Sequence, residues 1–291
     1  MINLLLLLAV IFWGLSFVAT KMVLQFLSPI EIIAIRLLLG IPVLYLVLKF
    51  KKKEIRFMKN DYLIIILASI ILGAHFLIQA IGMIYTTATN TAWLVATIPV
   101  FIAILSYFFL NEKMTANKIM GIIIATLGVV LLVSGGRLAT LGWLKSVGDW
   151  IILSSSVTWA IYTIITRNIT RRYNPLVVSL GLFLLPGVVL VAYAGISTPP
   201  AKFIHLPLNI ILALIFLGVF CLGIAHWFYL EGLSRKGATD VGVFIYLEPI
   251  VTTMAAIPIL NERPTLFAMA GIILIISGVY LVQRKSHFNN P

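Results

Sequence analysis

Two charged side chains stand inside long apolar segments, where a charge is costly unless it has a task or a partner. Glu248 lies about eight residues into the segment 241–260, and Arg36 lies inside the segment 30–48. A carboxylate in such a place binds a cationic group or takes up a proton, and a guanidinium attracts an anion such as a carboxylate. The structural alternatives are an ion pair for Glu248 and, for Arg36, a pair with Glu31 or a side chain that extends to the end of its segment.

Aromatic and hydroxyl side chains recur at matching depth in two other segments. Trp13 and Trp159 each lie about nine residues into an apolar segment, a depth of about 14 Å at 1.5 Å per residue. Tryptophan at a membrane interface would lie nearer the segment end. Together with Ser16, Tyr162 and Thr163 these rings would line a cavity for an amphiphilic ligand, although helix packing uses the same side chains.

Two further polar pairs share a helix face. His75 and Gln79 are one helical turn apart, and His226 and Tyr229 have the related spacing of three residues. Polar side chains in apolar helices either face a cavity or bridge neighbouring helices. We expect these four residues and Tyr246 to line the cavity.

Proline and glycine mark positions where the helices depart from regular geometry or approach closely. Pro99 and Pro249 should bend their helices, and Pro249 removes the N–H that would bond to the carbonyl of Ile245. Broken helices of this kind often form transporter sites. Glycines spaced by two turns permit close helix contact, which we expect inside the chain rather than in a dimer; these are Gly121, Gly128, Gly271 and Gly278.

Short polar residues near the segment ends have simpler interpretations. We expect Asn90 and Asp240 to be N-caps of the helices that follow them. Glu112 and Glu262 should belong to short turns between helices.

The composition requires that these residues be placed by membrane-spanning helices. Of 291 residues, 62% are hydrophobic and 10% are charged, whereas a soluble domain carries about 25% charged residues. The apolar residues form blocks of about 20 residues, enough to cross a hydrocarbon core of about 30 Å. We predict an all-α integral membrane protein with ten spans, at about 4–26, 30–48, 62–84, 90–110, 117–134, 149–167, 175–194, 208–230, 241–260 and 265–282.

The basic residues set the expected orientation. With a cytoplasmic N-terminus, the outside segments hold five of the 21 Lys and Arg residues: Lys21, Arg137, Lys145, Lys202 and Arg263. Fifteen fall in inside segments, above all Lys49 to Lys59, and Arg36 lies within a span. This excess predicts a cytoplasmic membrane protein with both termini in the cytoplasm. It also explains the net charge of +12 without nucleic acid as a partner.

The two halves of the chain repeat one another. Leu110-Asn111-Glu112-Lys113 recurs 150 residues later as Leu260-Asn261-Glu262-Arg263, and the same offset relates Ala88-Thr89-Asn90 to Ala238-Thr239-Asp240. Near the start of each half the offset is 146, which pairs Trp13 with Trp159. Since each copy holds five helices, the second must enter the membrane in the opposite direction. We predict repeats at 1–146 and 147–291, with a central cavity between them.

These motifs resemble the EamA-type branch of the drug/metabolite transporter superfamily. The resemblance rests on Ala80 to Ala88, Ile98-Pro99 and Asn111-Glu112-Lys113, and on Glu248-Pro249 and Asn261-Glu262-Arg263 in the second half. It covers essentially the whole chain. It implies ten helices, an inverted duplication, a central cavity, and movement of amino acids, sugars, nucleosides or related metabolites. Aromatic amino acid exporters belong to the same branch.

The sequence therefore favours a secondary transporter that exports small metabolites, such as amino acids or related amphiphilic solutes, by alternating access. The alternative is a passive channel or a non-transporting membrane protein. The motifs of ATP hydrolysis and of common hydrolases are missing, and the single Cys221 excludes a multi-cysteine metal site. We expect no enzymatic step, no cofactor and no metal. Beyond its substrate we expect the lipid bilayer as partner, proton coupling, and a monomer or homodimer.

Overall fold

The computed structural model describes residues 1–134, 146–199, 201–260 and 266–284, and in these residues the regular structure is entirely helical. The first half contains α1 (Ile2–Val23), α2 (Pro29–Phe50), η1 (Lys59–Asp61), α3 (Tyr62–Tyr85), α4 (Ala88–Val95), α5 (Ile98–Leu110) and α6 (Ala116–Ser134). The second contains α7 (Val147–Arg172), α8 (Pro175–Ser197), α9 (Ala201–Ile204), α10 (Leu208–Ile215), η3 (Phe216–Ala225), α11 (His226–Arg235), α12 (Ala238–Gly242), η4 (Val243–Leu247), α13 (Glu248–Leu260) and α14 (Leu266–Gln283).

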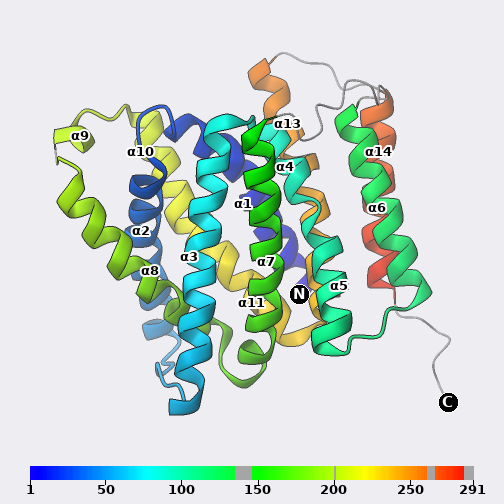
Figure 1. Ribbon diagram of the computed structural model, residues 1–291, viewed down its shortest axis with the longest axis horizontal. Helices are drawn as coiled ribbons and strands as arrows, with labels where there is room; N and C mark the ends of the chain where they lie inside the picture. Colours follow the sequence, from blue (N-terminus) through cyan, green and yellow to red (C-terminus); the bar gives the residue numbers. More distant parts are fainter. Residues whose placement is uncertain (135–145, 200, 261–265, 285–291) are drawn as a thin grey trace.

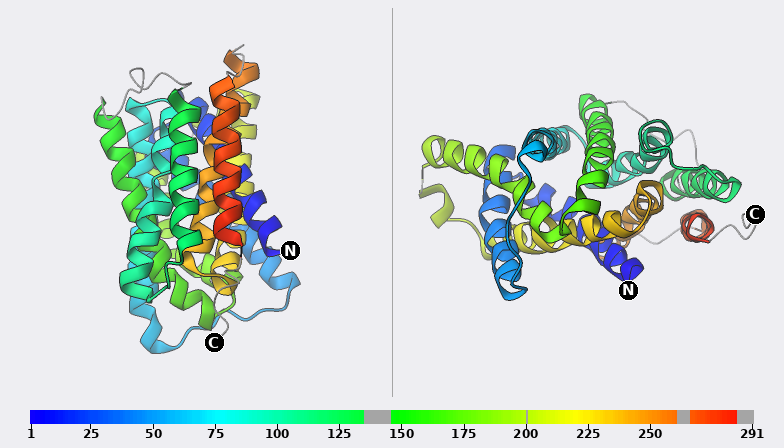
Figure 2. Two further views of the ribbon diagram at one scale, coloured as in Figure 1. Left: turned by 90° about the vertical axis from the view of Figure 1, so that its right-hand side faces the viewer. Right: turned by 90° about the horizontal axis from the view of Figure 1, so that it is seen from below.

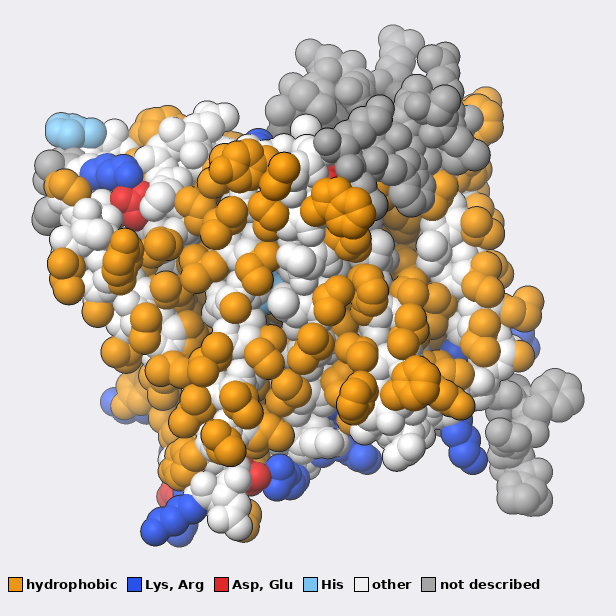
Figure 3. Space-filling model, viewed as in Figure 1, with side chains coloured by type: hydrophobic (Ala, Val, Ile, Leu, Met, Phe, Trp, Pro, Cys, Tyr) orange, Lys and Arg blue, Asp and Glu red, His pale blue; other side chains and the backbone are white. Residues whose placement is uncertain are grey.

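Eight helical segments of the described chain are long and apolar enough to cross a bilayer. They are α1, α2, α3 with its leading turn η1, α4 with α5, α6, α8, α10 to α11, and α14. Figure 1 shows the long helices running side by side in one bundle, and Figure 3 shows hydrophobic side chains over most of the face it presents. The chain is therefore a multi-pass membrane protein.

The other two expected spans, 149–167 and 241–260, are helical but fall outside those eight segments. The first belongs to α7, a helix of 26 residues that runs along the bundle beside α3 (Figure 1). Its polar side chains are buried against other helices, including Asp149, Ser155 and Ser156. Because α7 packs against α3, α4, α5 and α11, it can carry polar groups that a lipid-facing helix cannot.

The other segment, 241–260, is divided into three pieces, because a 3₁₀-helix lies between two α-helices. α12 leads into the 3₁₀-helix η4, which passes directly into α13. In the first half, α4 and α5 are separated by a turn at Ala96 and Thr97. Pro99 and Pro249 both occupy the second position of the helix that follows the break, where the missing N–H costs no helical hydrogen bond.

Several contacts between helices have a counterpart in which each helix is replaced by the one at the same place in the other half of the chain. α3 packs on α7, and the counterpart is the packing of the segment α10 to α11 on α1. α2 packs on η3, and the counterpart is the packing of α8 on α3. α2 also meets α8, and α6 meets α14. Figure 2 shows the α6–α14 pair at one edge of the bundle.

Four glycines bring α6 and α14 into backbone contact. A Cβ atom on Gly121 would lie 2.6 Å from the carbonyl oxygen of Gly278, and one on Gly128 would lie 2.8 Å from that of Gly271. Residue numbers rise along α6 in the direction in which they fall along α14, so the two helices are antiparallel. The glycines thus serve internal packing.

The α6–α14 contact predicts that Gly128→Ala lowers the melting temperature of the protein in detergent. The added methyl group meets backbone atoms that cannot move aside, and overpacking costs about 1–3 kcal/mol. Gly195→Ala is the matched control, because a Cβ atom there meets nothing within 4 Å and alanine favours the helix by about 1 kcal/mol. Equal melting temperatures for both variants, measured by thermal unfolding, would contradict the contact.

Candidate functional site

A small cavity lies in the middle of the bundle, enclosed by the broken helices and by α1, α2, α3 and α7. Its lining consists of Trp13, Ser16, Phe17, Arg36, His75, Phe76, Gln79, Val95, Ile98, Trp159, Ile245 and Glu248. The room for the centres of water molecules is about 40 Å³, enough for roughly three waters at 10–15 Å³ each. A metabolite therefore needs the surrounding helices to move apart.

The cavity contains the two charged side chains, Arg36 and Glu248, that the sequence singled out. Glu248 is 2% exposed and Arg36 is 7% exposed. Within the described residues, neither forms an ion pair within 4 Å. The guanidinium of Arg36 lies 5.2 Å from the ring centre of Phe76, and its Nε atom has no hydrogen-bond partner there.

The suggested structural partner of Arg36 is engaged elsewhere. The carboxylate of Glu31 accepts hydrogen bonds from Lys202 at 2.7 and 2.8 Å and from Thr198 at 2.9 Å. It also caps the start of its own helix through the backbone N–H of Ser28. Arg36 is therefore left facing the cavity.

Trp159 is the centre of an aromatic cluster beside the cavity. Its ring centre lies 4.8 Å from that of His75, 5.2 Å from that of Trp13 and 5.4 Å from that of Tyr229. Trp13 is held at the edge of the cluster by a 3.0 Å hydrogen bond from Nε1 to the carbonyl oxygen of Cys221. This carbonyl belongs to η3, a π-helix, and such segments often occur at functional sites.

Five residues that we expected in the lining lie behind it, in hydrogen bonds between helices. The Tyr162 hydroxyl lies 2.7 Å from Nε2 of His226, and the hydroxyl groups of Thr163 and Tyr229 are 2.8 Å apart. The fifth, Tyr246, lies 2.7 Å from the hydroxyl of Thr126. These side chains brace α7, α11, η4 and α6 against one another, and in this conformation none of the five is in the lining of the cavity.

His75 and Gln79 do face the cavity, on α3. Nδ1 of His75 lies 2.9 Å from the carbonyl oxygen of Ser155. Because a carbonyl oxygen only accepts, Nδ1 carries a proton, and Nε2 is the nitrogen left for a ligand or a water.

The broken helices bring backbone as well as side chains to the cavity. Ile98 begins α5 and Glu248 begins α13, and both residues are in the lining. The expectation that the carbonyl of Ile245 is left free is wrong, since this carbonyl accepts the backbone N–H of Glu248. Thr252 of α13 donates to the carbonyl oxygen of Gly14 at 2.8 Å, which fixes α13 against α1.

The assigned N-caps are also wrong. Thr87 is the N-cap of α4 and accepts the backbone N–H of Asn90, whose side chain accepts from Trp93. Gly237 is the N-cap of α12, so Asp240 lies in the first turn. Glu262 lies outside the described residues.

Sequence patterns missed the apolar part of the lining. Phe17, Phe76, Val95, Ile98 and Ile245 have the same residue types as the lipid-facing surface. Their only signal was nearness to residues already chosen: Phe17 follows Ser16, and Phe76 follows His75.

A bundle of apolar helices around a small cavity with polar and charged lining is the architecture of a membrane transport protein. Residues 1–134 and 146–284 match the EamA-like transporter family, and the chain belongs to this family. It is 30% identical over 280 residues to a protein of Archaeoglobus fulgidus that bears the name "Uncharacterized transporter", covering 96% of this chain and 97% of the relative.

One further relative agrees with this assignment, and one solved structure shares the fold. The "Uncharacterized transporter YyaM" of Bacillus subtilis is 28% identical over 274 residues, covering 92% of this chain and 89% of the relative. A solved crystal structure superposes with a TM-score of 0.78 at 18% identity, covering 98% of this chain and 99% of that one. The protein is thus a transporter by family, with a fold already seen by crystallography.

The aromatic cluster predicts that Trp159→Ala destabilises the folded protein strongly. Trp159 is 4% exposed, and removing a buried tryptophan costs about 3–5 kcal/mol. Trp150 of the same helix is 57% exposed, so Trp150→Ala should leave the melting temperature in detergent nearly unchanged. A similar fall in both variants would show that Trp159 has no special place in the packing.

Proposed function

We propose that the protein is a secondary transporter that exports amino acids or related amphiphilic metabolites by alternating access. The observation that carries this proposal is that two charged side chains, Arg36 and Glu248, line one cavity and that neither has an ion-pair partner among the described residues. An amino acid presents a carboxylate to the guanidinium and an ammonium group to the carboxylate. Its side chain would then meet Trp13, Phe17 and Phe76.

The energetic argument is one of compensation. A charged group inside a membrane protein costs several kcal/mol unless it is paired, protonated or hydrated. A zwitterion supplies a partner to both groups at once. A solute that lacks one of the two charges leaves the other group unpaired, and sites built on such groups reject incomplete ligands strongly.

The proposed mechanism requires two inverted halves, 1–146 and 147–291, with ten spans in all. The proposal adds α7 and the broken segment α12 to α13 to the eight apolar spans. It is supported by the paired helix contacts, because exchanging the halves converts the α3–α7 contact into the contact of α10 to α11 with α1. The antiparallel α6–α14 pair agrees, since equivalent helices of inverted halves run in opposite directions.

The contacts on two sides of the cavity favour a carrier over a passive channel, because a channel needs a continuous opening. On one side, Lys21 near the end of α1 donates to the carbonyl oxygens of Met83 and Thr86 at 2.6 and 2.8 Å, and Thr86 donates to Asp149. On the other side, α5 packs against α12 and η4. In alternating access, contacts of this kind on the two sides of the site separate and form again in turn.

The charge pair predicts a matched set of transport defects. In proteoliposomes, Arg36→Gln should weaken amino acid binding tenfold or more, since a charge-assisted hydrogen bond contributes about 1.5–3 kcal/mol. An amine without a carboxylate should compete poorly with the amino acid for binding to the wild-type protein. For binding to the variant, the amine and the amino acid should compete equally well. If that amine competes as strongly as the amino acid in the wild type, Arg36 does not read the carboxylate.

Glu248 should couple transport to the proton gradient. Glu248→Gln keeps the shape of the side chain but cannot exchange a proton, so counterflow should persist while net transport loses its dependence on a pH gradient. The matched control is Glu231→Gln, because Glu231 pairs with Arg235 on its own helix. Unchanged pH dependence in folded Glu248→Gln would assign the carboxylate to structure.

We further propose that the protein lies in the cytoplasmic membrane with both termini in the cytoplasm. Figure 3 shows the Lys and Arg side chains of the visible face mainly along its lower margin, as the positive-inside rule requires of a cytoplasmic end. A reporter active only in the cytoplasm should be active when fused to the C-terminus or placed between Lys51 and Lys53. Activity of a periplasmic reporter at the C-terminus would overturn the ten-span proposal.

A further inference from the structure

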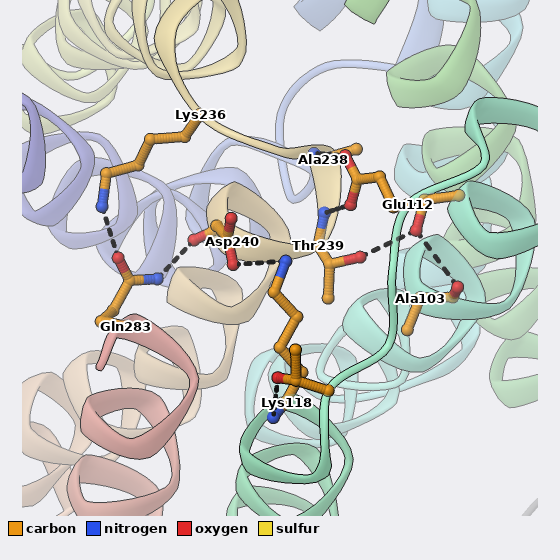
Figure 4. A network of polar contacts seen from close by, with 10 residues as sticks. Ala103, Glu112, Lys118, Lys236, Ala238, Thr239, Asp240 and Gln283 are labelled. Atoms are coloured by element: carbon orange, nitrogen blue, oxygen red, sulfur yellow. Dashed lines mark hydrogen bonds and ion pairs between the residues drawn. The ribbon is translucent and has the colours of Figure 1, made fainter. Parts of the chain in front are cut away.

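The motif that recurs most clearly in the sequence, Leu-Asn-Glu, has a contact in the structure that the proposed function does not use. Asn111 ends α5 in a left-handed conformation with φ of 52°, which turns the chain toward the other half. The carboxylate of Glu112 then accepts hydrogen bonds from the backbone N–H groups of Ala238 and Thr239, the latter at 3.1 Å. Figure 4 shows this carboxylate facing the first turn of α12.

Glu112 therefore caps a helix of the opposite half. Backbone N–H groups in the first turn of a helix lack intrahelical partners, and a carboxylate is their strongest acceptor. The start of α12 has no cap from its own N-cap residue, which is Gly237. A Cβ atom on Gly237 would lie 2.9 Å from Oε1 of Glu112 and 3.0 Å from Oδ2 of Asp240, so the close approach depends on glycine.

Two more contacts at the same place also join the halves. The hydroxyl groups of Ser106 and Thr239 are 2.7 Å apart, and Lys118 forms an ion pair with Asp240 at 2.9 Å (Figure 4). By contrast, the contacts of Gln283 lie within the second half: it accepts from Lys236 and donates to the carbonyl oxygen of Asp240 at 2.6 Å. Relative motion of the halves would break the first set and leave α12 attached to α14.

The contacts between α5 and α12, called the seam below, continue to the central cavity. Along α5, Ser106 meets Thr239, and the buried side chain of Ile102 lies where a Cβ atom on Gly242 would be only 2.8 Å away. One turn further, Ile98 lines the cavity. On the other side of the seam, Glu112 lines a surface hollow of about 200 Å³. The seam thus separates that hollow from the cavity.

We propose that the hydrogen bonds between the Glu112 carboxylate and α12 keep this end of the cavity closed, and that their loss opens the cavity toward the α5–α6 turn. This contact is called the latch below. α12 leads through η4 directly to Glu248, so Glu112 positions the segment that carries this carboxylate without touching the substrate. The inference rests on the proposed alternating access. Its test uses accessibility alone, which requires no knowledge of the substrate.

The test places one cysteine in the cavity as a reporter. With Cys221→Ala as background, Ser16→Cys puts a thiol in the lining, and a charged, water-soluble maleimide labels it when the cavity opens. Labelling is followed in detergent by mass spectrometry of the peptide. Glu112→Ala should raise the labelling rate roughly tenfold, the factor that corresponds to about 1.4 kcal/mol. Glu231→Ala, which breaks a pair within α11, should not change the rate.

A cross-link provides the opposite change in the same background. Ser106→Cys with Thr239→Cys replaces hydroxyl groups 2.7 Å apart, close enough for sulfur atoms to bond at about 2.05 Å. Oxidation of the two thiols to a disulfide by oxygen with a copper catalyst should slow labelling of the reporter in the Glu112→Ala chain to the rate of the intact latch or below. Reduction with dithiothreitol, which is removed before the maleimide is added, should restore the fast rate. If the Glu112→Ala chain folds poorly, Glu112→Gln takes its place in both experiments.

The outcomes separate the latch from the proposed function. Faster labelling without Glu112 that the cross-link reverses supports the latch, even if no amino acid is ever transported. Equal labelling rates with and without Glu112, in chains whose melting temperatures match that of the background, overturn it. Fast labelling that persists in the oxidised cross-linked chain overturns it as well, because the cavity would then open elsewhere.

Discussion

The constraint on which this structure depends is that polar groups inside a hydrocarbon layer must find their partners within the protein. α7 meets this constraint by lying among other helices, so that Ser155, Ser156 and Thr163 are fully shielded from lipid. The aromatic cluster around Trp159 and the hydrogen-bonded tyrosines follow from its position. The eight more apolar segments can then face lipid, and the cavity forms where packing around α7 is incomplete.

Against this background, Arg36 and Glu248 are exceptions that the fold supports at a cost. Several other polar groups near the cavity are bonded to a neighbour, such as Tyr162 to His226 and Thr252 to the backbone of Gly14. The two charges are the groups that an arriving solute can complete. Stability would favour an apolar pair at these positions, and the proposed function gives both charges a task in binding.

Periodicity and segment length predicted the helices well, because a span leaves a signal of about 20 apolar residues. They did not decide which polar side chains face the cavity. His75 and Gln79 line it while Tyr162 and Tyr229 bond to other helices, a difference set by the rotation of each helix in the packed bundle. Glu112 looked like an ordinary turn residue because its partner Ala238 is 126 residues away in sequence. Such long-range contacts have no local pattern.

The small size of the cavity has a consequence for the cell's energy supply. A path of continuous water through a membrane protein lets protons pass along hydrogen-bonded chains and discharges the membrane potential. In the described conformation the cavity has room for roughly three waters, and contacts such as those of Lys21 and Ser106 lie between it and the two ends of the bundle. Three waters are too few to form a hydrogen-bonded chain across a hydrocarbon layer of about 30 Å. In this conformation the cavity therefore offers protons no route of that kind across the membrane.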